Sequence, residues 1–246
     1  NAVIKKNLLD IKRKYKDPRR TQIIFGHKEE NVTKETFKTV EDAVVSIDRT
    51  GFIRRVQVKN YNLSNKDIPA TPDDALVCVH QVQTDMNMLL FSNLGFAYNI
   101  KVEDIPEYKW RDKGCAPGRL CTGWADNECI LLAIPYKNIL PNGNVMFMTK
   151  GGMIKVSSLE EYAVKKSKFN AITLKNDDVL VNIEIAKPDN TVLYITASGM
   201  SLNMDISDIS ITGRVTSGVK GISVDDSDYV VFAKQISDEG EVVLFT

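Results

Sequence analysis

Short apolar runs alternate with small polar turns along most of the chain from residue 41 onward. The runs are mostly four to seven residues long and rich in Val, Ile and Phe, which is typical of β-strands. The pattern predicts strands at 44–47, 52–58, 77–82, 89–91, 130–134, 145–148, 179–185, 192–195, 229–232 and 242–245. We therefore expect an all-β domain.

Four of the turns repeat one pattern, in which a strand, a small polar turn closed by glycine and a second strand follow one another. The closing glycines recur 44, 57 and 47 residues apart, at Gly51, Gly95, Gly152 and Gly199. A fifth copy begins at Glu241, and residues 171–178 match 221–228, so each unit is predicted to hold about four strands. Glycine suits the positive φ of a tight hairpin. A β-rich repeat of this length is typical of the blades of a propeller-like disc.

A different pattern covers the start of the chain. Apolar residues recur there at steps of 4, 3 and 4, which predicts an α-helix with coiled-coil spacing through Ile4, Leu8, Ile11 and Tyr15. Pro18 ends this helix, because the residue before proline avoids the helical conformation. A helix this short is marginal alone, so we expect it to belong to a longer helical domain upstream. The predicted organisation is a helix and connector at 1–20, a linker at 21–40 and the β domain at 41–246.

Several classes of function lack their sequence signals. No apolar run approaches the roughly 18–20 residues of a membrane span, and the first segment lacks the apolar core of a signal peptide, so we expect a cytoplasmic protein with no membrane partner. The four cysteines include no C-x-x-C pair, which favours reduced thiols over a metal site. No nucleophile-elbow, P-loop or zinc-protease motif occurs. The sequence therefore predicts no catalytic residue and no metal ligand.

Charge is balanced overall but unevenly placed. The chain has 32 basic and 32 acidic residues. Residues 1–20 hold eight of the basic and two of the acidic residues, so the remaining chain has 24 basic and 30 acidic residues. A protein that binds the phosphate backbone normally carries a basic footprint. If the net-acidic β domain binds DNA, it must do so through a local basic face.

Four segments resemble one known family. Residues 8–21, which close on Arg-Arg-Thr, resemble the end of the coiled-coil segment in bacterial type IIA topoisomerase A subunits. Residues 51–55 (Gly-Phe-Ile-Arg-Arg) and 102–107 (Val-Glu-Asp-Ile-Pro-Glu) are similar to hairpin and connecting segments of that family's C-terminal domain. Residues 213–222 (Gly-Arg-Val-Thr-Ser-Gly-Val-Lys-Gly-Ile) resemble its late-blade motif. The likeness covers essentially the whole chain, in order.

The resemblance implies a β-pinwheel, a disc of about five or six four-stranded blades that exchange strands between neighbours, preceded by a short N-terminal α-helix. It implies that the domain binds and bends duplex DNA and presents it to the cleavage core of the same subunit. The attacking tyrosine lies in that core, and the holoenzyme pairs two such subunits with two ATPase B subunits. ATP and Mg²⁺ act elsewhere in the holoenzyme, so no cofactor is expected in this domain of a bacterial, cytoplasmic enzyme.

One departure from the family pattern bears on function. Gyrase A subunits carry a Q-R-R-G-G-[K/R]-G box after the first hairpin, whereas residues 61–70 read Tyr-Asn-Leu-Ser-Asn-Lys-Asp-Ile-Pro-Ala. In the family the box is tied to chiral wrapping of DNA, so its absence favours a topoisomerase IV-like protein that relaxes and decatenates. Two alternatives stay open. One is a divergent gyrase A domain that wraps DNA, and the other is a propeller scaffold that binds only proteins.

Basic residues around the first hairpin are the leading candidates for DNA contact, because arginine binds phosphate in bidentate fashion. The positions that match Arg54-Arg55 carry fewer basic residues in later repeats, where they are Tyr98-Asn99, Lys155-Val156 and Leu202-Asn203. DNA contacts are therefore expected mainly on the first and third repeats. Further basic clusters lie on the predicted excursions 101–117 and 157–168. Ordinary solvated surface charge is the alternative for all of them. The candidates are Arg49, Arg54, Arg55, Lys59, Lys109, Arg111, Lys113, Arg119, Lys150, Lys155, Lys165, Lys166, Lys168, Arg214 and Lys220.

Two tryptophans lie beside one of these clusters. Trp110 is within it and Trp124 follows it. Stacking on bases is one possible role, but the bases of a duplex are not available for it, so we expect both side chains to pack within the protein.

Overall fold

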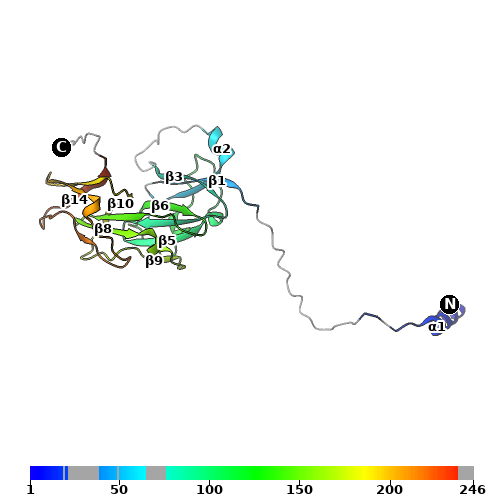
Figure 1. Ribbon diagram of the computed structural model, residues 1–246. Helices are drawn as coiled ribbons and strands as arrows, with labels where there is room; N and C mark the ends of the chain where they lie inside the picture. Colours follow the sequence, from blue (N-terminus) through cyan, green and yellow to red (C-terminus); the bar gives the residue numbers. More distant parts are fainter. Residues whose placement is uncertain (19, 22–38, 49, 65–75, 238–246) are drawn as a thin grey trace. The chain divides into compact units, whose positions relative to one another are not determined.

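The computed structural model describes residues 1–18, 20–21, 39–48, 50–64 and 76–237 (Figure 1). The chain divides into two compact units, Asn1–Thr39 and Val40–Thr246. The predicted linker at 21–40 lies largely outside the described residues. In the first unit, α1 (Ala2–Tyr15) confirms the predicted helix, and all of its residues are exposed. Its apolar stripe is therefore open to solvent along the whole helix.

In the second unit the described residues form four antiparallel sheets, each built on one of the predicted glycine hairpins. The hairpins are β1 (Asp42–Asp48) with β2 (Ile53–Gln57), β4 (Asn87–Ser92) with β5 (Phe96–Lys101), β7 (Asn144–Thr149) with β8 (Met153–Ser158), and β11 (Thr191–Thr196) with β12 (Ser201–Asp205). A third strand pairs with the first strand of each hairpin: β3 (Leu76–Gln83), β6 (Ile130–Tyr136), β10 (Leu180–Ala186) and β14 (Val230–Ile236). The fifth copy expected from Glu241 lies outside the described residues.

Two sheets gain a fourth strand from a distant part of the chain. β9 (Lys168–Asn170) pairs with β5, and β13 (Val219–Lys220) pairs with β8. In the first sheet, isolated bridges join Ile53 to Cys115 and Arg55 to Glu107 at the same edge. Each of these pieces follows the next hairpin along the chain, so neighbouring blades exchange strands. We call residues 107–115, 164–170 and 211–220 the first, second and third outer segments.

Single helical turns complete the repeat. One turn follows the second strand of each hairpin, as α2 (Val58–Leu63), η2 (Val102–Asp104), η3 (Leu159–Tyr162) and η4 (Ile206–Asp208). The short helix α3 (Pro117–Leu120) follows the first outer segment. These turns redirect the chain from the hairpin toward the next blade.

The hairpin turns share one hydrogen-bonding scheme. Each closing glycine has φ between 77° and 86°, and its N–H donates to the carbonyl three residues earlier. The side chain of the residue that supplies this carbonyl also accepts a hydrogen bond, from the N–H of the residue that follows the glycine. At Thr149, for example, Oγ1 lies 3.0 Å from the nitrogen of Met153. The matching side chains are Asp48, Ser92 and Thr196. The scheme confirms the predicted positive φ of the glycine, and it shows why a small polar residue begins each turn.

The core lies between successive sheets. Alternate residues of β4 face opposite neighbours, because side chains alternate across a strand. Met88 and Leu90 pack with residues of the first sheet, whereas Leu89 and Phe91 pack with residues of the third sheet. Burial on both faces explains why β4 reads as a continuous apolar run rather than an alternating one.

Candidate nucleic-acid interface

The two arginines of the first hairpin are engaged within the protein. Arg54 Nη1 donates to the carbonyls of Trp110 and Asp112, both at 2.9 Å, and the guanidinium lies 5.4 Å from the centre of the Trp110 ring. Arg55 Nε donates to the carbonyl of Ile105 at 2.9 Å. Both side chains therefore hold the chain around the first outer segment. Arg49 lies outside the described residues.

Lys155 occupies the position that matches Arg54 in the third hairpin, and it is buried. Its ammonium group donates to Tyr162 Oη and to the carbonyls of Ala171 and Arg214. Burial, together with the nearby positive charge of Arg214, lowers the pKa of Lys155 to about 8. A group enclosed by three acceptors cannot reach a phosphate, so the interpretation of Lys155 as a contact residue needs correction.

Two further candidates are also partly engaged. Lys168 Nζ donates to the carbonyl of Gly123 and lies 4.0 Å from the centre of the Phe96 ring. Arg214 Nη1 donates to the carbonyl of Asn170, and its guanidinium lies 5.3 Å from the centre of the Phe169 ring. Both residues tie an outer segment to a neighbouring part of the chain.

The remaining candidates are exposed. Lys113 lies 4.2 Å from the centre of the Phe52 ring, Lys150 lies 4.3 Å from that of Tyr229, and Lys220 donates to Ser223 at 3.0 Å. In each contact the ammonium group itself meets a neighbouring side chain, but the lysine stays exposed. The exposed candidates are Lys59, Lys109, Arg111, Lys113, Arg119, Lys150, Lys165, Lys166 and Lys220.

Strand exchange places part of this charge on matching edges of neighbouring sheets. The first outer segment carries Lys109, Arg111 and Lys113, and the second carries Lys165 and Lys166, all exposed. In the third outer segment, Val215 occupies the place of Arg111 and Lys165. Five of the nine exposed candidates therefore lie on the first and second outer segments and one, Lys220, lies on the third, whereas the sequence predicts DNA contacts mainly on the first and third repeats. The hairpin sequences alone do not predict this distribution, because the basic residues lie on outer segments from a distant part of the chain.

The tryptophans pack within the protein, as expected. The rings of Trp110 and Tyr61 are 4.8 Å apart in an edge-to-face arrangement. The rings of Trp124 and Tyr98 are 5.5 Å apart. Both indoles therefore support blade structure.

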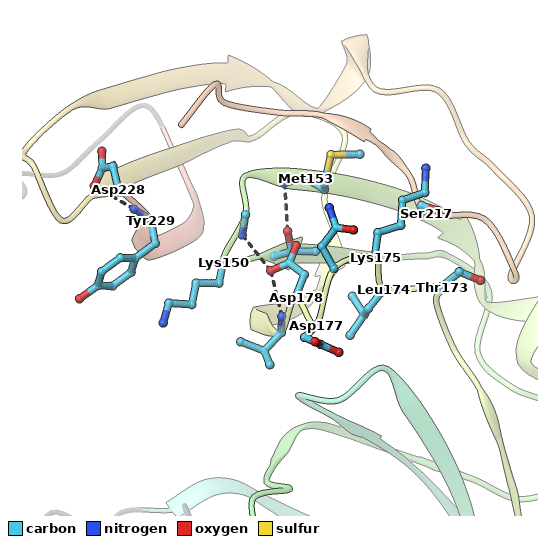
Figure 2. A pocket seen from close by; sticks show the side chains of 14 residues that line it. Lys150, Met153, Thr173, Leu174, Lys175, Asp177, Asp178, Ser217, Asp228 and Tyr229 are labelled. Atoms are coloured by element: carbon cyan, nitrogen blue, oxygen red, sulfur yellow. Dashed lines mark hydrogen bonds between the residues drawn. The ribbon is translucent and has the colours of Figure 1, made fainter. Parts of the chain in front are cut away.

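A hollow of about 600 Å³ is lined by the turn of the third hairpin, residues 173–179, Ser217, Asp228 and Tyr229 (Figure 2). Its lysines, Lys150 and Lys175, are exposed. Two of its carboxylates serve the backbone: Asp178 accepts N–H groups of Gly151 and Val179, and Asp228 accepts those of Ser198 and Tyr229. Hydrogen bonds from Ser198 and Thr196 lower the pKa of Asp228 to about 2. The Asp228 carboxylate therefore stays ionised, and both carboxylates fix the loops, which suits a structural role.

The thiols are suited to packing rather than to nucleophilic chemistry. All four cysteines are free, and burial raises the pKa values of Cys78 and Cys121 to about 12. Within the described part of the chain, no cluster of three or more His, Cys, Asp or Glu side chains is arranged to hold a metal ion. Among the described helices, none combines the length and apolar character needed to cross a membrane.

Comparisons with known proteins agree with one another. A family model described as "DNA gyrase C-terminal domain, beta-propeller" matches residues 87–114, 143–187 and 190–237. The chain is 29% identical over 247 residues to the A subunit of DNA topoisomerase 4 from Bacillus subtilis (strain 168), covering 99% of this chain and 30% of that protein. The corresponding protein of Staphylococcus epidermidis is 29% identical over 250 residues, covering 100% of this chain and 31% of that protein. The chain thus spans less than a third of the length of these relatives.

Solved structures show the same likeness. The C-terminal domain of a DNA topoisomerase IV superposes with a TM-score of 0.74 at 29% identity, covering 82% of this chain and 63% of that one. The E. coli ParC C-terminal domain shares the fold alone, with a TM-score of 0.60 at 14% identity over 80% of each chain. The repeated glycine hairpins and exchanged outer strands thus occur in a chain that matches these relatives over nearly all of its own length. The chain belongs to the family of β-pinwheel C-terminal domains of bacterial type IIA DNA topoisomerase A subunits.

Proposed function

We propose that this domain binds duplex DNA through its phosphates, along the first and second outer segments. The observation that carries the proposal is the set of five exposed cations on matching edges of two neighbouring sheets, Lys109, Arg111, Lys113, Lys165 and Lys166. Cations on an edge follow the path of a backbone rather than reading bases, so little sequence preference is expected. The acidic remainder of the domain confines the DNA to this edge.

The family places this domain within a larger enzyme. We infer that the whole protein is the A subunit of an ATP-dependent type II DNA topoisomerase. The domain would bend DNA and present it to the cleavage core of the same polypeptide. That core would act with the ATPase B subunit in an A2B2 holoenzyme. Two curated relatives are topoisomerase 4 A subunits, and residues 61–70 lack the gyrase box, so we favour a topoisomerase IV-like enzyme.

Salt dependence tests the DNA interface. If five phosphates are neutralised, the slope of log affinity against log salt is expected near −4.5, or about a 500-fold loss between 50 and 200 mM salt. Replacing Lys109, Arg111 and Lys113 together by alanine should flatten the slope by about 2.7, because each lost phosphate contact contributes about 0.9. Fluorescence anisotropy with a labelled duplex measures both quantities.

The matched control replaces Lys187 and Lys234 by alanine. Both are exposed lysines outside the outer segments, and they should leave the slope unchanged. An equal loss of affinity per removed charge in the control would show that net charge matters and that the outer segments do not. A wild-type domain that fails to bind at 50 mM salt would instead favour the protein-scaffold alternative, which the net-acidic β domain also suits.

A ligation experiment separates the topoisomerase IV-like interpretation from the gyrase-like one. A nicked plasmid would be incubated with the domain, sealed with ligase and stripped of protein. We expect no shift in linking number at protein concentrations that saturate binding. A shift that grows with protein would reveal chiral wrapping and favour the gyrase-like alternative.

A further inference from the structure

One amide nitrogen holds two carbonyls of the second outer segment. Asn99 Nδ2 donates to the carbonyl of Val164 at 2.6 Å and to that of Lys166 at 3.1 Å. The other end of the amide, Oδ1, accepts the hydroxyl of Tyr136 at 3.2 Å. The main-chain N–H of Asn99 donates to the carbonyl of Ser167 at 2.9 Å. Asn99 on β5 therefore fixes both the orientation of its own amide and the path of the neighbouring peptide groups.

The first outer segment has the equivalent contact from a different residue. Arg54 Nη1 donates to the carbonyls of Trp110 and Asp112. The register pairs Tyr98 with Lys168, and Ile53 with Cys115, which places 110 and 112 opposite the same hairpin positions as 164 and 166. Two donors of different chemistry, on adjacent hairpin positions, thus bridge the same pair of carbonyls in neighbouring blades.

A basic residue stands between the two bridged carbonyls in both cases. It is Arg111 in the first outer segment and Lys165 in the second, and both are exposed. In the third outer segment the corresponding carbonyls have separate donors: that of Arg214 accepts from Lys155, and that of Thr216 accepts from the main chain of Thr173. The residue between them there is Val215. The shared donor and the basic residue therefore occur together.

We propose that Asn99 and Arg54 are positioning residues for phosphate binding, which rests on the proposed DNA interface. Each holds the backbone on both sides of one cation, so that Lys165 and Arg111 stand at matching places on neighbouring blades. A cation on a fixed backbone loses less conformational freedom when it binds than one on a free loop. The two donors themselves stay within the protein and touch no DNA.

The test is a double-mutant cycle on DNA binding. Asn99→Ala is expected to weaken binding of a labelled duplex about fivefold to tenfold at low salt. It should also flatten the salt slope by about 0.9 to 1.8, the contribution of one or two phosphates. In a Lys165→Ala/Lys166→Ala background, Asn99→Ala should cause no further change in either quantity. A residue that acts only on overall stability would leave the salt slope of the folded fraction unchanged.

A matched control is Asn182→Ala. Asn182 Nδ2 also donates to a backbone carbonyl, that of Ala233 at 2.9 Å, but it lies on β10 away from the outer segments. It should leave the salt slope as in the wild type. If Asn99→Ala does not fold, Arg54→Met with and without Arg111→Ala provides the same cycle in the first outer segment.

The outcomes separate this proposal from the proposed function. A wild-type domain that does not bind DNA overturns the proposed function and this inference with it. If the wild type binds DNA and Asn99→Ala keeps the wild-type salt slope, the positioning role of Asn99 is overturned and the proposed function stands. An equal loss with and without Lys165 and Lys166 would also overturn it, because Asn99 would then act elsewhere.

Discussion

Replacing Lys155 by alanine is expected to lower the free energy of unfolding by about 3–5 kcal/mol. The variant leaves the carbonyl of Arg214 without its buried donor and opens a cavity beside Phe147 and Tyr162. Lys155→Met fills most of that volume, and Tyr162 Oη still donates to the carbonyl of Ala171, so its loss should be about 1–2 kcal/mol. Urea titration followed by tryptophan fluorescence measures the difference.

The control is Lys175→Ala, which removes an exposed lysine and should change stability by no more than about 0.5 kcal/mol. The pH dependence adds a second check. Because burial lowers the pKa of Lys155 to about 8 from 10.5, the native protein binds this proton less tightly than the unfolded chain between these values. The wild type should therefore gain stability relative to Lys155→Met as the pH rises through 8. A difference that is constant from pH 7 to pH 9.5 would contradict an enclosed ammonium.

Gly152→Ala is expected to destabilise the domain far more than Gly199→Ala, although the two glycines are equivalent in the repeat. Both have positive φ, 83° and 86°, which costs alanine about 1–2 kcal/mol. A Cβ on Gly152 would also stand 2.5 Å from the carbonyl oxygen of Ile222, a backbone atom beside the third outer segment. Among the described residues, none comes within 4 Å of the same point at Gly199. The excess loss in Gly152→Ala should be at least about 2 kcal/mol.

Thermal unfolding of both variants measures this difference, and Gly143→Ala provides a further comparison with positive φ and open surroundings among the described residues. Equal melting temperatures for Gly152→Ala and Gly199→Ala would mean that the exchanged strand yields easily. The N–H groups of Gly221 and Ile222 both donate to the carbonyl of Gly152. Equal melting temperatures would mean that these two hydrogen bonds do not hold the exchanged strand rigidly.

Local features of this fold were readable from the sequence, and long-range ones were not. The hairpins at Gly51, Gly95, Gly152 and Gly199 were predictable because a tight turn is specified by four or five adjacent residues. The family resemblance implied strand exchange, but the partner of each edge depends on a register set more than 50 residues away, as between β5 and β9. Only the structure shows which segment covers which hairpin.

Only part of the candidate site could be predicted from the sequence, for the same reason. Arg54 and Lys155 match in the repeat and both are predicted from the sequence to contact DNA. In the structure Arg54 donates to two carbonyls of the first outer segment, and Lys155 donates to the carbonyls of Ala171 and Arg214. A sequence shows that a cation is present at a position, but not whether a distant carbonyl accepts from it. Asn99 occupies the repeat position of Arg55, but its neutral amide is not predicted from the sequence to bind phosphate. Its importance depends on the carbonyls of 164 and 166, which no local pattern reveals.

Strand exchange also has a consequence for synthesis of the chain on the ribosome. The hairpin of β4 and β5 is complete at Lys101, but its outer partner, β9, begins only at Lys168. During this interval β5 presents an unpaired edge, which is a template for wrong pairing with another chain. Each new repeat therefore protects the one before it, so a ribosome that pauses within a repeat exposes an aggregation-prone edge in the repeat already made.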